Sequence, residues 1–251
     1  SYAGPTTIRN GGTLYLGASS GMPAQSVLVL GEPSLSSIGA ADFTGYNVVL
    51  GGLTAGGNQA PPNAITLGSG QSLTINGDVN IGNTLSGSSQ ANLTVNGAGA
   101  SLTVNTNGGL IQLGLSTSGN GTGPNKVNCD LTTLDVFTAN LGSAGSLLVG
   151  EVNLNTGNAP NNLQVLRLGA TNTITAGTIG IGNGGKIIKP ELHLGSATNV
   201  LNVDLVRLGL GDSGGRDSGK LFFESSLGSV RLRGPGGGAT SGPWTGVASS
   251  T

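Results

Sequence analysis

The chain has 251 residues, of which 48 are glycine; only 8% are charged, 3% are aromatic, and the formal net charge is −1. This composition excludes a collagen helix, which needs glycine at every third position and far more proline than the 10 residues present. It also excludes a charge-driven disordered chain and a helical protein, because the net charge is small and Gly, Asn, Ser and Thr form helices poorly.

A short phrase of four residues recurs along the chain. It consists of an apolar residue, any residue, a second apolar residue and Gly. Its copies, in chain order, are Leu14–Gly17, Leu28–Gly31, Val48–Gly51, Ile65–Gly68, Val79–Gly82, Ile111–Gly114, Ala139–Gly142, Leu166–Gly169, Ile179–Gly182, Leu192–Gly195 and Val206–Gly209. The glycines of the last four copies are almost evenly spaced. The interval from Gly82 to Gly114 is longer, and we interpret it as a doubled period in which one copy has lost its glycine.

The phrases and three further segments, Leu73–Asn76, Leu93–Asn96 and Leu102–Asn105, alternate apolar and polar residues. Alternation with a period of two indicates half-buried β-strands, and the terminal Gly or Asn suits a sharp turn. Because similar strands return at similar intervals, we predict an all-β fold, a parallel β-solenoid with apolar ladders inside and Asn, Thr or Ser ladders at its corners. The spacing leaves open whether one repeat unit or two make a coil.

We expect residues 1–233 to form a single β-solenoid domain and residues 234–251 to form a Gly-, Pro- and Ser-rich tail or linker. Residues 52–63, 116–124 and 156–162 are predicted to be corner loops. No amphipathic helix is evident that would cap either end. Uncapped solenoid ends expose strand edges, so we expect self-association through these ends.

The middle residue of each phrase is predicted to face away from the core, because both of its neighbours face inward. Arg167, His193 and Arg207 occupy this position in the C-terminal half and are predicted to form a strip that binds an anionic glycan. The competing interpretation is that these residues are ordinary polar side chains on a solvated surface.

We predict that the protein is not an enzyme; the enzymatic alternative is a glycan lyase or hydrolase. Two neighbouring carboxylates would be required for glycoside hydrolysis, and the candidates are Asp130, Asp135, Glu151, Glu191 and Asp204. No pair of them stands in a catalytic motif, and His193 has no identifiable nucleophile, since Cys129 is distant in sequence. The segment Gly209–Asp217 carries a single copy of a Gly/Asp pattern, so we expect no metal site and no cofactor.

Other classes of partner find little support in the sequence. Residues 1–125 contain one basic residue, Arg9, and residues 126–251 contain nine, with no strong positive field for nucleic acid. No apolar run approaches the length of about 20 residues that a transmembrane helix needs. Thr74, Thr94 and Thr103 occupy equivalent phrases, which makes an ice-binding solenoid a third, less favoured hypothesis.

The segments Asn10–Gly17 and Thr178–Gly185 resemble the repeats of bacterial autotransporter passengers and of other secreted β-helical adhesins. This resemblance in repeat style covers most of residues 8–233. It implies a right-handed parallel β-helix that is extracellular or displayed on the cell surface and acts as a stalk, adhesin or fibre or matrix subunit. The alternative function is a carbohydrate-binding or carbohydrate-cleaving β-helix that acts on an acidic polysaccharide.

Overall fold

The computed structural model describes residues 4–32, 37–57, 61–82, 90–114, 126–150, 163–182, 189–209, 219–234 and 236. Within these residues the regular elements are all β-strands, and none is a helix. Every pairing between the named strands is parallel. The prediction of an all-β fold built from repeated, parallel strands is therefore confirmed.

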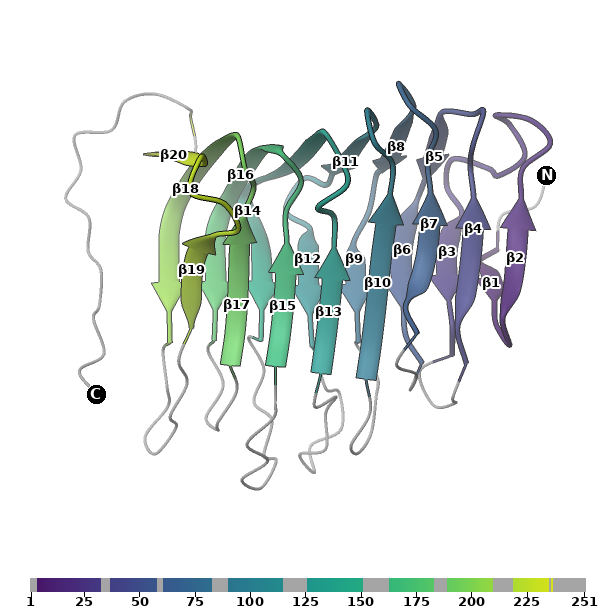
Figure 1. Ribbon diagram of the computed structural model, residues 1–251, viewed down its shortest axis with the longest axis horizontal. Helices are drawn as coiled ribbons and strands as arrows, with labels where there is room; N and C mark the ends of the chain where they lie inside the picture. Colours follow the sequence, from purple (N-terminus) through teal and green to yellow (C-terminus); the bar gives the residue numbers. More distant parts are fainter. Residues whose placement is uncertain are drawn as a thin grey trace.

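The strands form an 8-stranded and a 12-stranded sheet. We call the 8-stranded sheet row 2; it contains β2 (Gly12–Tyr15), β4 (Gly39–Asp42), β7 (Asn63–Thr66), β10 (Gln90–Asn96), β13 (Lys126–Asp130), β15 (Leu163–Arg167), β17 (Lys189–Leu194) and β19 (Lys220–Phe223). Figure 1 shows these strands side by side in chain order, from β2 at one end to β19 at the other.

The 12-stranded sheet bends and contains two rows of strands. Row 1 contains β1 (Thr6–Ile8), β3 (Val27–Leu30), β6 (Gly52–Ala55), β9 (Val79–Ile81) and β12 (Leu110–Leu113). Row 3 contains β5 (Val48–Leu50), β8 (Ser72–Ile75), β11 (Ser101–Asn105) and β20 (Ser229–Arg233). The long strands β14 (Val136–Val149), β16 (Thr171–Ile181) and β18 (Thr198–Leu208) belong to row 3 at their N-terminal ends and to row 1 at their C-terminal ends.

From β4 onward the chain visits row 2, row 3 and row 1 in constant order, and we call one such passage a circuit. Gly169 and Gly195 follow strands of row 2, whereas Gly182 and Gly209 follow strands of row 1. Two repeat units therefore make one circuit in this part of the chain. The circuits differ in length: Thr6 pairs with Leu28 near the N-terminus, but Cys129 pairs with the more distant Leu166.

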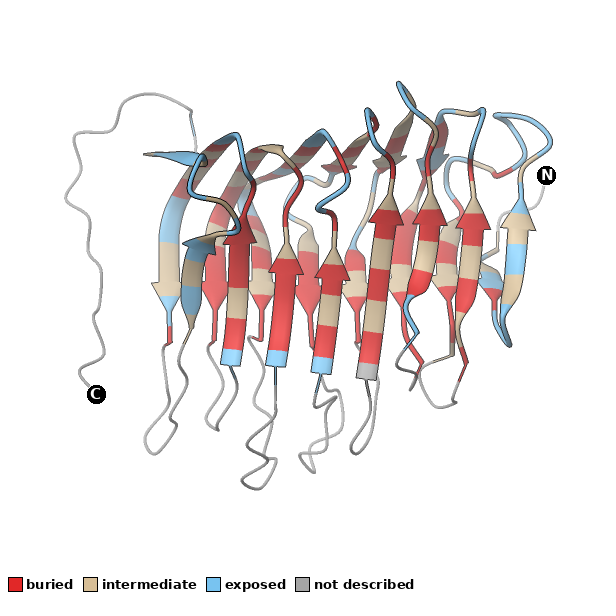
Figure 2. Cartoon of the chain, viewed as in Figure 1, coloured by how far each residue is buried: buried red, intermediate tan, exposed pale blue. Residues whose placement is uncertain are grey.

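Apolar ladders fill the interior, as the alternation predicts. In row 1 the ladder runs through residues that pair from strand to strand, namely Leu28, Leu53, Val79, Ile111, Leu147 and Ile179. All of them are buried, and Figure 2 shows how buried and partly exposed positions alternate along the central strands. The end strands β2, β19 and β20 are more exposed, because each lacks a described neighbour on its outer side.

Asparagines occur both at the end of a phrase and in the interior of the fold. The circuit between Gly82 and Gly114 contains β10, whose phrase ends in Asn96 instead of glycine. Buried asparagines appear later in the interior of row 3, where Asn172 and Asn199 are paired and follow Phe137 in the same ladder. The amide Nδ2 of Asn172 donates to Oδ1 of Asn199 over 2.7 Å, so two asparagines of neighbouring circuits bond to each other inside the core, not at a corner.

The loop predicted over residues 52–63 is wrong at its start, because Gly52–Ala55 forms β6 of row 1. A Cβ atom at Gly51 would overlap the backbone carbonyl of Gln25 on the preceding circuit. Gly51, directly before the predicted loop, therefore allows two backbones to approach each other closely. The predicted loops 116–124 and 156–162 lie outside the described residues, as does the tail 234–251 except for Gly234 and Gly236.

Candidate functional site

The structure separates the three residues of the predicted glycan-binding strip. Arg167 in β15 and His193 in β17 are direct cross-strand partners in row 2. Arg207 in β18 pairs with Gly180 in row 1, on a different row of strands. The repeated phrase alternates between two rows, so equal spacing in sequence does not place all three side chains on one face. The strip as predicted is therefore reduced to its Arg167–His193 pair.

This pair belongs to a polar cluster on row 2, which we call the histidine cluster: Asn128, Arg167, Glu191, His193, Lys220 and Glu224. Arg167 contacts Glu224 Oε1 through Nε at 2.9 Å and donates from Nη1 to Asn128 Oδ1, also at 2.9 Å. Lys220 Nζ lies 3.3 Å from Glu191 Oε1. The cluster thus links four neighbouring strands, β13, β15, β17 and β19, and the residue that follows β19.

His193 lies at the centre of the cluster between two carboxylates. Its Nε2 is 3.0 Å from Glu191 Oε2, and its Nδ1 contacts Glu224 Oε1. Both ring nitrogens donate a hydrogen bond only in the imidazolium form, which is the form that satisfies both carboxylates. The side chain is only 5% exposed, and the ring of Phe222 packs against it at a tilt of 48°, with 4.0 Å between the ring centroids.

The carboxyl group of Glu191 has a perturbed pKa. Burial acts to raise this pKa, but the hydrogen bonds from His193 and Lys220 and the charges of these residues together outweigh burial. The pKa of Glu191 therefore lies below its ordinary value, and the carboxylate form is favoured in the folded chain.

The geometry of the cluster favours a structural role over anion binding. Both carboxylates are paired with cations, and Arg167 is held by Asn128 as well as by Glu224. An acidic ligand would have to displace Glu224 from Arg167, at a cost in both ion pairing and hydrogen bonding. The contacts of Lys220 and Glu224 connect β19, the last described strand of row 2, to β17 and β15.

The other candidate acids do not join this cluster. Asp130 accepts a hydrogen bond from the backbone N–H of Thr132, and Asp135 accepts one from the N–H of Gly99. Asp204 lies on β18, and Glu151 is outside the described residues. Among the five acids predicted from sequence, Glu191 is the one that contacts His193. Glu224 and Asn128 were not predicted, because only the cross-strand register brings them to Arg167.

Cys129 faces the interior, between Leu93 and Leu166 in the ladder of row 2. It is buried, and burial raises the pKa of its thiol, so the reactive thiolate is disfavoured. His193 lies on the opposite, outward side of row 2. The two side chains therefore do not form a nucleophile–base pair.

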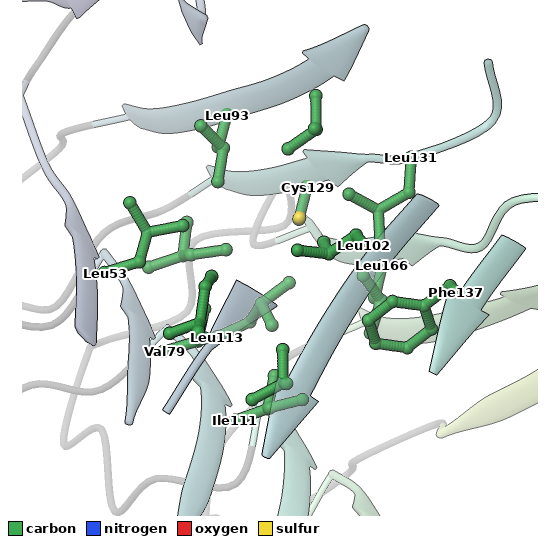
Figure 3. Close-up of a pocket in the computed structure, with 14 residues that line it drawn as sticks. Leu53, Val79, Leu93, Leu102, Ile111, Leu113, Cys129, Leu131, Phe137 and Leu166 are labelled. Carbon is green, nitrogen blue, oxygen red and sulfur yellow. The ribbon is translucent and has the colours of Figure 1, made fainter. Parts of the chain in front are cut away.

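A small cavity in the interior has a volume of about 20 Å³. Figure 3 shows its apolar lining, which includes Leu53, Cys129 and Phe137 from three different strands. The cavity has room for a water molecule at most, and the lining offers water no strong hydrogen-bond partner. It is a packing defect in the core and has no room for an organic ligand.

Neither a metal-binding cluster nor a membrane-spanning helix is present in the described part of the chain. No group of three or more His, Cys, Asp and Glu side chains is arranged there to hold a metal ion, and most of the Gly209–Asp217 segment lies outside that part. None of the described segments is a helix long and apolar enough to cross a membrane. In comparisons with known proteins, no family model, no curated protein and no solved structure matches the chain.

Proposed function

We propose that this chain is a right-handed parallel β-helix that serves outside the cell as a structural or adhesive rod and extends by joining end to end. The constant order of the three rows supports the helical path. Parallel strands of one sheet joined by a crossover are right-handed in about 98% of cases, which supports the handedness. The low charge and the resemblance in repeat style support a place at the cell surface or in a matrix.

The observation that carries this proposal is the pair of open edges. Among the described residues, β1 and β2 at one end and β19 and β20 at the other end each pair on only one side. Because all the strands are parallel, a second copy that is shifted along the axis presents strands of the correct direction. Main-chain hydrogen bonds could then continue from one copy to the next, as in β-strand addition.

The last circuit also exposes apolar side chains that a further circuit would cover. Leu205, Leu208, Phe222, Leu227 and Val230 are exposed there, and Leu227 is 83% exposed. At the other end, Tyr15 is 71% exposed. Exposed apolar groups at both edges favour association, since their burial releases free energy at about 25 cal/mol per Å².

Sedimentation velocity over a wide range of protein concentration tests this proposal. We expect the sedimentation coefficient to rise with concentration and electron micrographs to show filaments of constant width. The variant Val230→Lys, in the edge strand β20, should remain monomeric because lysine at an edge blocks strand addition. Val136→Lys is the matched control, since Val136 has similar exposure (40% against 37%) but lies in the central strand β14.

Two outcomes would contradict end-to-end growth. The wild-type chain would remain monomeric at all concentrations, or Val230→Lys and Val136→Lys would assemble equally well. The alternative function, binding or cleavage of an acidic polysaccharide, has less support. Its cationic residue Arg167 is already paired within the histidine cluster, and Arg207 lies on another row.

A further inference from the structure

Row 3 presents a column of four threonines on its outer face. Thr74, Thr103, Thr138 and Thr173 pair directly from strand to strand in β8, β11, β14 and β16. The alternation of each strand places their side chains away from the core, and all four are partly exposed. Thr94 occupies a sequence phrase equivalent to those of Thr74 and Thr103, but the prediction that it joins them is wrong, because Thr94 pairs with Ala64 and Asp130 in row 2.

Two further columns flank the threonines on the same face. One contains Ser72, Ser101, Val136 and Thr171, and the other contains Asn105, Asn140, Thr175 and Asn202. The flanking amides bond to their neighbours: Asn140 Nδ2 donates to Asn105 Oδ1 over 2.8 Å, and Asn202 Nδ2 donates to Thr175 Oγ1 over 3.2 Å. These bonds between circuits hold one border of the face in a regular arrangement.

The hydroxyl groups of the central column are available to a ligand. Among the described residues, Thr74, Thr103, Thr138 and Thr173 form no side-chain hydrogen bond, and their oxygen atoms are not among the buried atoms without a partner. They are therefore accessible to solvent. The column combines these hydroxyls with the threonine methyl groups in an array that repeats about every 4.8 Å across strands.

The chemistry of this face excludes several kinds of partner. From β8 to β16 its outward positions contain no charged residue, so nucleic acid and acidic glycans lack the cations that they need. No aromatic residue lies at these positions, and a sheet face is not the concave, aromatic-lined site that small organic ligands prefer. What remains is a neutral, periodic array of hydroxyl and methyl groups.

We infer that this face, which we call the threonine face, binds the ordered water at the surface of an ice crystal. Residues two apart along a strand are about 6.7 Å apart, and strands are about 4.8 Å apart. Both spacings are close to repeat distances between water molecules on the prism faces of hexagonal ice. The methyl groups order the water beside them, and the hydroxyls anchor that water by hydrogen bonds. This inference does not depend on end-to-end assembly, because the threonine face and the strand edges are separate surfaces.

Partition into slowly growing ice tests the inference. A dilute solution of the chain and a labelled inert globular protein is frozen onto a cooled probe, and both proteins are measured in the ice and in the remaining liquid. We expect the chain to be enriched in the ice while the inert protein is excluded. The double variant Thr103→Lys/Thr138→Lys should lose this enrichment, because two ammonium groups disrupt the neutral array.

The control is Thr54→Lys/Thr66→Lys, which places two lysines at partly exposed positions of rows 1 and 2. It should enter ice as the wild type does, and Val230→Lys should do so too. If lysine in the threonine face prevents folding, as judged by circular dichroism, Thr138→Tyr replaces it, since strands accept Tyr well but its ring interrupts the array of hydroxyl and methyl groups. Three results would overturn the inference: exclusion of the wild type from ice, unchanged enrichment of a folded threonine-face variant, or binding to crystalline cellulose without enrichment in ice.

Discussion

The buried amide of Asn199 makes the sharpest prediction about stability. Asn199 is fully buried, and its Oδ1 accepts hydrogen bonds from the backbone N–H of Gly195 at 2.9 Å and from Nδ2 of Asn172 at 2.7 Å. Its Nδ2 donates to the carbonyl oxygens of Gly195 and Ser229 at 3.1 and 3.0 Å. One side chain thus joins the turn after β17 to strands β16, β18 and β20.

The substitution Asn199→Ala removes all four hydrogen bonds and leaves the N–H of Gly195 without its side-chain acceptor. A buried donor or acceptor left without a partner costs about 1–3 kcal/mol, and at least two such groups are created. We therefore expect the substitution to cost about 3 kcal/mol, which corresponds to about a 100-fold change in an equilibrium constant. Each circuit contacts mainly its neighbours, so the loss should be concentrated around β16 to β20.

Amide hydrogen exchange measured by mass spectrometry tests this prediction. In Asn199→Ala, exchange of the peptides that contain Gly195 and Ser229 should accelerate about 100-fold, whereas peptides from β3 to β9 should exchange as in the wild type. Asn202→Ala is the matched control. Asn202 lies on the same strand, makes one hydrogen bond at 3.2 Å to Thr175 and has an Oδ1 atom without a partner, so its loss should cost less than about 1 kcal/mol. Equal effects of the two substitutions would refute the reasoning.

Three further predictions concern the close backbone approach and the histidine cluster. A Cβ atom at Gly195 would overlap the carbonyl oxygen of Gly169, so Gly195→Ala should lower the free energy of unfolding in urea by about 3 kcal/mol. The control Gly17→Ala should be neutral, because Gly17 has open space around it. A neutral Gly195→Ala would show that the two backbones separate easily. Glu224→Gln weakens contacts to both Arg167 and His193, whereas Glu32→Gln weakens only the exposed pair with Arg9. The melting temperature of the protein should therefore fall further with Glu224→Gln than with Glu32→Gln. The reverse order would contradict the structural role of the histidine cluster. Because the pKa of Glu191 is lowered in the folded chain, its stabilising contribution is present above the ordinary pKa of 4.5 and is lost as the pH falls through the lower folded value. Melting temperatures between pH 6 and pH 3 should therefore decline more steeply for the wild type than for Glu191→Gln. Parallel curves would show that Glu191 makes no such contribution.

Local alternation was sufficient to predict many strands. Leu73–Asn76 and Leu102–Asn105 correspond closely to β8 and β11, because apolar residues at every second position define a strand and its buried face within a short window. Glycine was a less certain guide. Gly52 was interpreted as the start of a loop although it begins β6, and at Gly57, inside the predicted loop, the close carbonyl oxygen of Ser37 excludes a side chain.

The candidate sites could be predicted only in part. Arg167 and His193 occupy the same position in alternate phrases and pair as the period suggests. Glu224 also contacts His193, but it belongs to none of the repeated phrases, so the period does not predict this contact. Thr138 and Thr173 join Thr74 and Thr103 in one column although they stand in different sequence phrases. Which residue pairs with a given residue on the next circuit depends on the total number of residues in the corners between the two strands. No local sequence pattern predicts that number.

The sequence by itself determined the all-β class, the repeated parallel strand and the inward or outward direction of most side chains. These features are local, since they follow from a period of two and from residues that suit turns. The tertiary structure alone decided which row each phrase joins, because the corners, and with them the intervals between paired residues, vary in length along the chain. It therefore decided that Arg207 lies apart from Arg167, that two carboxylates enclose His193, and that four threonines align on one face.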